Sequence, residues 1–242
     1  MKLTFQIDSE YDKKMIPIML SRGDWEDRAK RMGLGRPLAT KIHELCKLGK
    51  FAEAEKELDE IVNSTYKKIK PYISKTKDMY QESWNEIIDD FSKTVAELTV
   101  PWFFDEYFVV VTNFNMGLRD PKGDKIGRWW KENPYTQRRL TAYELIQAHF
   151  VEIHRRLYKE SGLDNSQIWA LAEIASNALT GLEDGLKKHW IWDNKGYYTD
   201  HNYPQLVELQ KQLLDPYLNK KSFAEYVEKG IELVKQFPSL AP

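Results

Sequence analysis

The chain has 242 residues, which is enough for one large domain or two small ones with a substantial buried core. Hydrophobic residues make up 42% and charged residues 30%, a balance that excludes an intrinsically disordered chain. Lysine plus arginine (36) nearly cancel aspartate plus glutamate (37), so the net charge of −1 provides no global attraction to nucleic acid or to an anionic membrane. Cys46 is the only cysteine, which excludes an internal disulfide and a cysteine-based zinc site.

The sequence carries no signal for a membrane or for secretion. No run of about 18 apolar residues occurs anywhere. The opening MKLTFQIDSEYDKK lacks the apolar stretch of a signal peptide. We therefore expect a cytoplasmic protein with no membrane partner.

The first part of the chain predicts one short strand followed by helices. Residues 2–7 alternate apolar and polar side chains, which is typical of a strand. Residues 15–20 indicate a helix, and Asp24 is the expected N-cap of the next helix, WEDRAKRM. A further helix is expected from Pro37 to Gly49.

Two amphipathic helices are expected between residues 51 and 98. The first begins at Phe51 and should be broken or kinked at Pro71, because proline removes a helical hydrogen bond. The second is traced by apolar residues three and four positions apart: Tyr80, Trp84, Ile87, Ile88, Phe91, Val95 and Leu98.

The character of the sequence changes after Pro101. Residues 103–114 are β-branched and aromatic, as in a buried strand, and residues 115–135 form a predicted loop with a short strand at Ile126–Trp130. We expect helices at about 137–161, 165–180 and 222–236, with a turn-rich aromatic stretch, WDNKGYYTDHNYP, before the last. The predicted fold class is α+β, predominantly helical, with a small sheet and long helices. We expect one globular unit, mainly helical over residues 1–100, with a seam near residue 100.

The two long helices carry polar residues where apolar ones are expected. Gln147 and His154 lie on the broad apolar face of the 137–161 helix, and Glu144 lies at its edge. Glu173 is the only charged residue between Ser166 and Leu182 in the following helix. A carboxylate in such a helix must be exposed, paired or functional, because an unpaired buried charge is costly.

The segment Tyr143–Gln147, with the sequence YELIQ, resembles the HExxH motif of gluzincin zinc metallopeptidases with both histidines replaced. Glu173, 26 residues after Gln147, is similar to the glutamate that supplies the third zinc ligand in that family. The resemblance covers roughly residues 101–182 and implies a zincin-like core in the half 101–242. It places Glu144 at the general-base position and Tyr143 and Gln147 at the histidine positions.

The replaced histidines change the expected function. Tyrosine and a glutamine amide are poor zinc ligands, so the resemblance implies a pseudo-enzyme without zinc or another cofactor, which retains a cleft for a peptide or protein partner. Two alternatives remain open. The chain could be a helical interaction or scaffold protein in which a cation such as an arginine bridges Glu173. It could also be a non-zinc hydrolase that uses Glu144 and Glu173 as acid and base.

Two other groups of residues have simpler interpretations. His149 and His154 are five positions apart, so their rings diverge and cannot bind one metal from a regular helix. We expect His154 to be a hydrogen-bonded core residue and His149 a surface residue paired with Glu152. Basic residues and two tryptophans share the segment 122–139, which we interpret as a solvated loop, so a nucleic-acid partner is not expected.

Overall fold

A computed structural model describes residues 1–114, 119–120, 122–190, 203–237 and 240. Within these residues the chain forms eleven α-helices, one 3₁₀-helix and three strands, so the predicted α+β, predominantly helical class is confirmed. The chain divides into two compact units. We call residues 3–83 and 107–132 the sheet unit, and residues 1–2, 84–106 and 133–242 the helical unit.

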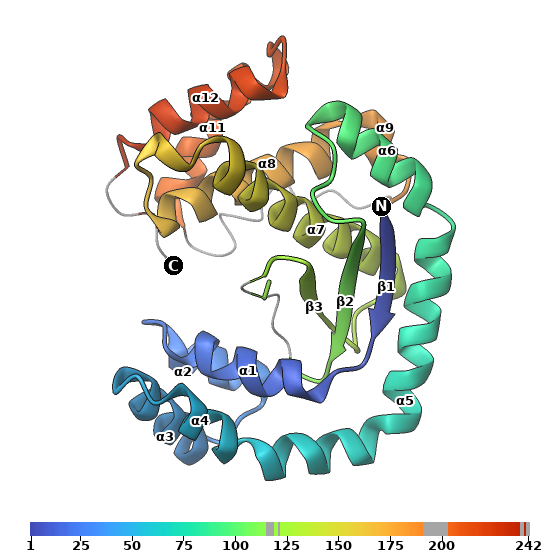
Figure 1. The fold of residues 1–242 in the computed structure, drawn as a ribbon, viewed down its shortest axis with the longest axis vertical. Helices are drawn as coiled ribbons and strands as arrows, with labels where there is room; N and C mark the ends of the chain where they lie inside the picture. Colours follow the sequence, from blue (N-terminus) through green and yellow to red (C-terminus); the bar gives the residue numbers. More distant parts are fainter. Residues whose placement is uncertain (115–118, 121, 191–202, 238–239, 241–242) are drawn as a thin grey trace. The chain divides into compact units, whose positions relative to one another are not determined.

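Each unit is built from segments that are separated in the sequence (Figure 1). The strands and the first five helices are β1 (Lys2–Gln6), α1 (Ser9–Leu20), α2 (Trp25–Met32), α3 (Arg36–Lys47), α4 (Phe51–Glu57), α5 (Asp59–Asn85), β2 (Glu106–Thr112) and β3 (Lys125–Trp129). The remaining elements are α6 (Ile88–Leu98), α7 (Pro134–Leu157), η1 (Lys159–Ser161), α8 (Asn165–Leu182), α9 (Asp184–Lys187), α11 (Pro204–Leu218) and α12 (Phe223–Val234).

The sheet has the order β1-β2-β3, and β2 and β3 run parallel with Val110 opposite Gly127. The centre of β2 is fully buried, as its continuous apolar sequence predicts for a central strand. The predicted strand at 126–130 is β3, shifted by one residue. Val110 and Phe114 join the apolar faces of α1 to α4 in one core of the sheet unit.

Local sequence signals explain where the first helices begin and end. The Asp8 carboxylate accepts the amide hydrogen of Glu10 and so caps α1. Asp24 stands at the predicted N-cap of α2, but its carboxylate pairs with Arg28 instead of capping the helix. Gly33 ends α2 with a φ of 71°, a left-handed conformation that glycine adopts without strain.

The helices around Pro71 and Asn85 differ in detail from the prediction. α5 contains Pro71, and Figure 1 shows that this helix changes direction along its length, as expected for a helix kinked by proline. The single helix predicted over residues 80–98 is divided, because α5 ends at Asn85 and α6 begins at Ile88. Ile87 stands between them outside helical geometry, with a φ of −124°.

In the helical unit α8 packs along α7 and also contacts α11 and α12. α7, α8 and α12 confirm the three predicted helices, whereas α11 was not predicted. An aspartate capping box at Asp164 begins α8. The predicted turn-rich stretch at 192–204 lies almost wholly outside the described residues.

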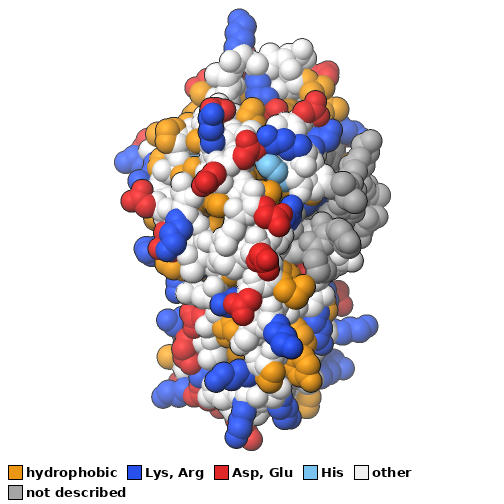
Figure 2. All heavy atoms as spheres, turned by 90° about the vertical axis from the view of Figure 1, so that its right-hand side faces the viewer, with side chains coloured by type: hydrophobic (Ala, Val, Ile, Leu, Met, Phe, Trp, Pro, Cys, Tyr) orange, Lys and Arg blue, Asp and Glu red, His pale blue; other side chains and the backbone are white. Residues whose placement is uncertain are grey.

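The surface carries charges of both signs, as the near-equal numbers of basic and acidic residues predict. On the face drawn in Figure 2, acidic and basic side chains are interspersed without a broad area of one sign. None of the described helices combines the length and the apolar character needed to span a membrane. The expectation of a single globular unit with a seam near residue 100 stays a prediction.

Candidate functional site

Tyr143, Gln147 and Glu173 meet between α7 and α8 of the helical unit. Tyr143 and Gln147 are four residues apart on α7, so both side chains point to the same side of the helix. The Tyr143 hydroxyl donates a hydrogen bond to Oε2 of Glu173 and lies 3.2 Å from the main-chain carbonyl oxygen of the same residue. The side chain of Gln147 also hydrogen-bonds to the Glu173 carboxyl group. The arrangement gathers three of the residues singled out by the sequence around one buried carboxyl.

Burial controls the acidity of Glu173, which is only 6% exposed. The pKa of this carboxyl is raised from 4.5 to about 7, first by desolvation and also by the nearby charge of Glu144. Hydrogen bonds from Tyr143, Gln147 and Trp169 act in the opposite direction, because they stabilise the ionised form. Among the described residues, the groups that shift this pKa are neutral donors and one carboxylate, and none is a cation.

Trp169 belongs to the site although the sequence analysis did not select it. Its side chain hydrogen-bonds to Glu173, and its ring meets Tyr203 edge-on with the centroids 5.9 Å apart. Trp169 precedes Glu173 by four residues in α8, so helical spacing alone places both on one face. That spacing is the sequence signal from which the proximity of Trp169 to Glu173 could have been predicted. Nothing in the local sequence indicates the contact with Tyr203, which is 34 residues further along the chain.

Glu144 is the second carboxylate of the cluster. It is partly buried at the edge of the α7 face, as predicted, and its charge acts on Glu173. Within the residues that the structure describes, no group of three or more His, Cys, Asp or Glu side chains is arranged to hold a metal ion. The raised pKa of Glu173 lets this carboxyl hold and exchange a proton near neutral pH.

His154 occupies a separate position on α7. It is 5% exposed, and its Nε2 lies 2.8 Å from Oγ of Ser161 in η1. Burial lowers its pKa. The prediction of a hydrogen-bonded core histidine is confirmed, and among the described contacts His154 takes no part in the Glu173 cluster.

The prediction that His149 lies at the surface beside Glu152 is wrong. His149 is 1% exposed, because the residues after α6 fold over it, and its Nε2 lies 3.1 Å from the carbonyl oxygen of Val100. The ring packs on Trp102 at a centroid distance of 4.4 Å. Burial lowers the pKa of His149 to about 4, so the ring is neutral at physiological pH. Glu152 is also buried, and its carboxylate pairs with Arg155 and Arg156.

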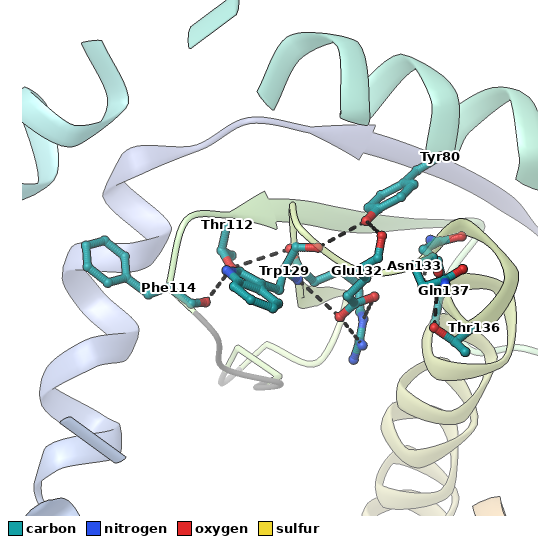
Figure 3. Close-up of polar contacts among 10 residues, drawn as sticks. Tyr80, Thr112, Phe114, Trp129, Glu132, Asn133, Thr136 and Gln137 are labelled. Carbon is teal, nitrogen blue, oxygen red and sulfur yellow. Dashed lines mark hydrogen bonds and ion pairs between the residues drawn. The ribbon is translucent and has the colours of Figure 1, made fainter. Parts of the chain in front are cut away.

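The aromatic and basic residues after β2 form a network within the sheet unit (Figure 3). Trp129 and Trp130 are partly buried, and both donate their indole N–H to Asn113 over 3.0 Å, the former to its main-chain oxygen and the latter to its side chain. The guanidinium of Arg128 pairs with Glu132. Figure 3 also shows the Tyr80 hydroxyl beside the carbonyl oxygens of Trp129 and Glu132, at 3.2 Å from each.

Other basic residues of the segment 122–139 also have acidic partners within their own unit. These pairs are Lys122 with Asp124, Lys125 with Asp8, and Arg138 with Glu86. Lys131 lies over the rings of Trp129 and Trp130, at 5.8 and 5.2 Å from their centroids. The segment is thus held largely by internal ion pairs and indole hydrogen bonds.

No protein-family model, no curated protein and no solved structure matches this chain. The function must therefore be inferred from the chain's own residues and their geometry.

Proposed function

We propose that this protein is a catalytically inactive relative of the gluzincin metallopeptidases that binds a peptide or protein partner in a cleft beside α7 and α8. The observation that carries the proposal is the convergence of Tyr143, Gln147 and Glu173. These are the three positions to which the sequence resemblance assigns the zinc ligands. The side chains that the resemblance assigns to the metal thus face one another across the α7–α8 pair.

The chemistry of the replaced ligands supports a binding role over hydrolysis. Two imidazoles would donate electron pairs to a metal, whereas the Tyr143 hydroxyl and the Gln147 amide donate hydrogens to the Glu173 carboxyl. Hydrogen bonds thus satisfy the carboxyl that would otherwise bind zinc. Glu144 retains the general-base position, but without a metal-bound water it has no activated nucleophile to deprotonate.

The proposal is tested by restoring the two histidines. In the double variant Tyr143→His/Gln147→His, two imidazoles one helical turn apart would face Glu173, and we expect one zinc ion per chain by elemental analysis after dialysis. The wild-type protein is expected to retain less than about a tenth of that amount, since a single carboxylate ligand does not hold zinc.

A matched control separates a restored site from incidental histidine binding. Adding Glu173→Gln to the double variant removes the third ligand with little change in size, and zinc affinity should fall by more than the roughly 10–100-fold that loss of an outer-shell partner costs. Circular dichroism establishes that each variant is folded. A folded double variant that binds no zinc, or a triple variant that binds zinc as tightly as the double variant, would refute the assignment.

A second candidate function follows from the acidity of Glu173. A buried carboxyl with a pKa of about 7 near a second carboxylate is an arrangement suited to acid–base catalysis at neutral pH. In that case the protein is a non-zinc hydrolase that uses Glu144 and Glu173. A hydrolytic activity lost in both Glu144→Gln and Glu173→Gln, with each variant folded by circular dichroism, would favour this function over the first. The scaffold alternative predicted a cation beside Glu173, and the neutral donors found there give it no support.

A further inference from the structure

A cavity of about 290 Å³ lies in the helical unit between α8, α11 and α12. Aliphatic side chains make up much of its described wall: Ile174, Ala178, Leu182, Leu213 and Leu214. Tyr217 and Tyr226 complete the apolar lining. This volume is close to the lower limit for small-molecule sites, and a mainly apolar wall with a few polar groups is typical of them.

Two leucines of the wall remain open to solvent. Leu182 is 42% exposed and Leu214 is 44% exposed. Covering apolar surface is favourable by about 25 cal/mol for each Å², so a hydrocarbon group seated between them would gain free energy from both. Ala178 lies between these helices with its small side chain, and its size leaves the space open.

The wall also carries polar groups that can meet the head group of a ligand. Gln210 donates a hydrogen bond to Oδ1 of Asn177 over 3.2 Å, and both line the cavity. Lys211 is the only charged side chain among the described residues of the wall. A single ammonium group beside an apolar space is complementary to a ligand with one negative charge and a hydrocarbon tail.

We propose that this cavity binds a single-chain amphiphile, with its hydrocarbon tail between α8, α11 and α12 and its carboxylate beside Lys211. Lys211 is exposed to solvent and lines the cavity, so a carboxylate can pair with it in place, whereas a cationic head group would be repelled. A large apolar partner surface would extend past the cavity and bury Lys211, at the cost of desolvating its charge. A slender anionic amphiphile meets both constraints. The site uses residues other than the Glu173 cluster, so it stands or falls independently of the function proposed above.

The experiment measures the binding of a series of amphiphiles to the full chain by calorimetry, below their micelle concentrations. The probes are octanoate, decanoate and dodecanoate, with decanol as the neutral counterpart and decylammonium as the cationic one. Affinity should rise by about fourfold for each added methylene until the tail fills the cavity. Decanoate should bind more tightly than decanol, and decylammonium should bind most weakly.

Three variants in the wall and one control variant locate the binding. Lys211→Gln should weaken decanoate by about threefold to fivefold and leave decanol unchanged, while Lys229→Gln, an exposed lysine on α12, should change neither. Ala178→Phe fills the cavity and should abolish binding of every probe. Because that change can disturb the fold, Leu214→Gln serves as a second variant at an exposed wall position and should weaken decanoate and decanol alike.

Several results would overturn the proposal. These are the absence of decanoate binding, a cationic probe that binds as well as decanoate, or decanoate binding that survives in both folded wall variants. The oligomeric state is measured by sedimentation in the same samples. A wild-type dimer that Leu214→Gln converts to a monomer would show that a second copy, and not an amphiphile, covers the cavity.

Discussion

Glu173 illustrates how the environment of one residue sets its chemistry. In water its carboxyl would be ionised at neutral pH, but in the α7–α8 interface burial opposes ionisation and the charge of Glu144 adds to that effect. Three hydrogen-bond donors partly compensate. The result is a carboxyl that gains or loses its proton near pH 7, and this property can be measured without knowing a substrate.

The pH dependence of stability should reveal this carboxyl. The pKa of Glu173 is 4.5 in the unfolded reference and about 7 in the fold, so between these values the unfolded state binds fewer protons. Stability must therefore fall as the pH rises through this window. Glu173→Gln keeps most hydrogen bonds without a charge. We expect its free energy of unfolding to rise relative to wild type by about 3 kcal/mol between about pH 5 and about pH 8, measured by urea denaturation.

Asp12 provides an independent comparison in the sheet unit. Burial raises its pKa from 3.8 to about 7, against a hydrogen bond from Tyr66. The free energy of unfolding of Asp12→Asn should therefore also rise relative to wild type as the pH increases through this window. The effects of the two variants should add, because the two carboxyls share none of their described partners. If the stability of Glu173→Gln runs parallel to that of wild type at all pH values, the Glu173 carboxyl does not carry a raised pKa in the fold.

At the scale of elements, α8 is the helix on which both inferences depend. One of its faces carries Glu173 toward α7, and another lines the amphiphile cavity with α11 and α12. Its small residues permit this close packing on several sides. Space is tight at Gly230 of α12, where an added Cβ would lie 3.1 Å from Leu171 Cδ2 of α8.

Two glycine substitutions should have opposite effects on stability. Gly230→Val pushes a branched side chain against Leu171 and Leu213, and we expect it to lower the free energy of unfolding by about 1–3 kcal/mol. Gly181→Ala, in the last turn of α8 with nothing within 4 Å of the new Cβ, should raise it by about 0.5 kcal/mol. Chemical denaturation of both variants tests this pair.

A compensating change checks the cause at Gly230. Shortening the neighbour in Gly230→Val/Leu171→Ala opens the space that the valine needs, so the double variant should be more stable than the sum of the two single effects predicts. If the two single effects on the free energy of unfolding simply add, the contact with Leu171 is not the cause of the destabilisation.

At the scale of the whole chain, the segments of the two units alternate along the sequence. The chain begins with two residues of the helical unit, forms most of the sheet unit, returns to the helical unit at residue 84, and repeats this exchange at residues 107 and 133. A cut at residue 100, where the sequence composition changes, would therefore separate α1 to α5 from β2 and β3. These strands and the residues next to them supply Val110 and Phe114 to the core of the sheet unit.

Two N-terminal fragments of the chain should therefore differ in the cooperativity of their unfolding. Residues 1–100 lack two of the three strands, so we expect them to retain helical circular dichroism but to unfold without a cooperative transition. Residues 1–132 contain every segment of the sheet unit and should unfold cooperatively. Thermal and urea denaturation of both fragments decide this, and a cooperative 1–100 fragment would contradict the importance of the two strands.

Local patterns predicted most of the elements. β2 follows from its buried apolar run, α8 from its long and mostly apolar sequence, and the bend in α5 is consistent with Pro71. α11 was missed although Leu206, Leu209 and Leu213 have helical spacing. Its prolines near both ends and the turn-rich residues before it hid the pattern.

The sequence by itself determined the fold class, the helical spacing of Tyr143 and Gln147, and the polar residues to examine, because these depend on neighbours within about one or two helical turns. Only the tertiary structure decided which of them meet. It buried His149 under Val100 and Trp102, and it brought the Glu173 carboxyl within hydrogen-bonding distance of side-chain donors on α7. Such contacts join residues far apart in the chain, and desolvation depends on everything that packs around a group, so no local pattern can specify them.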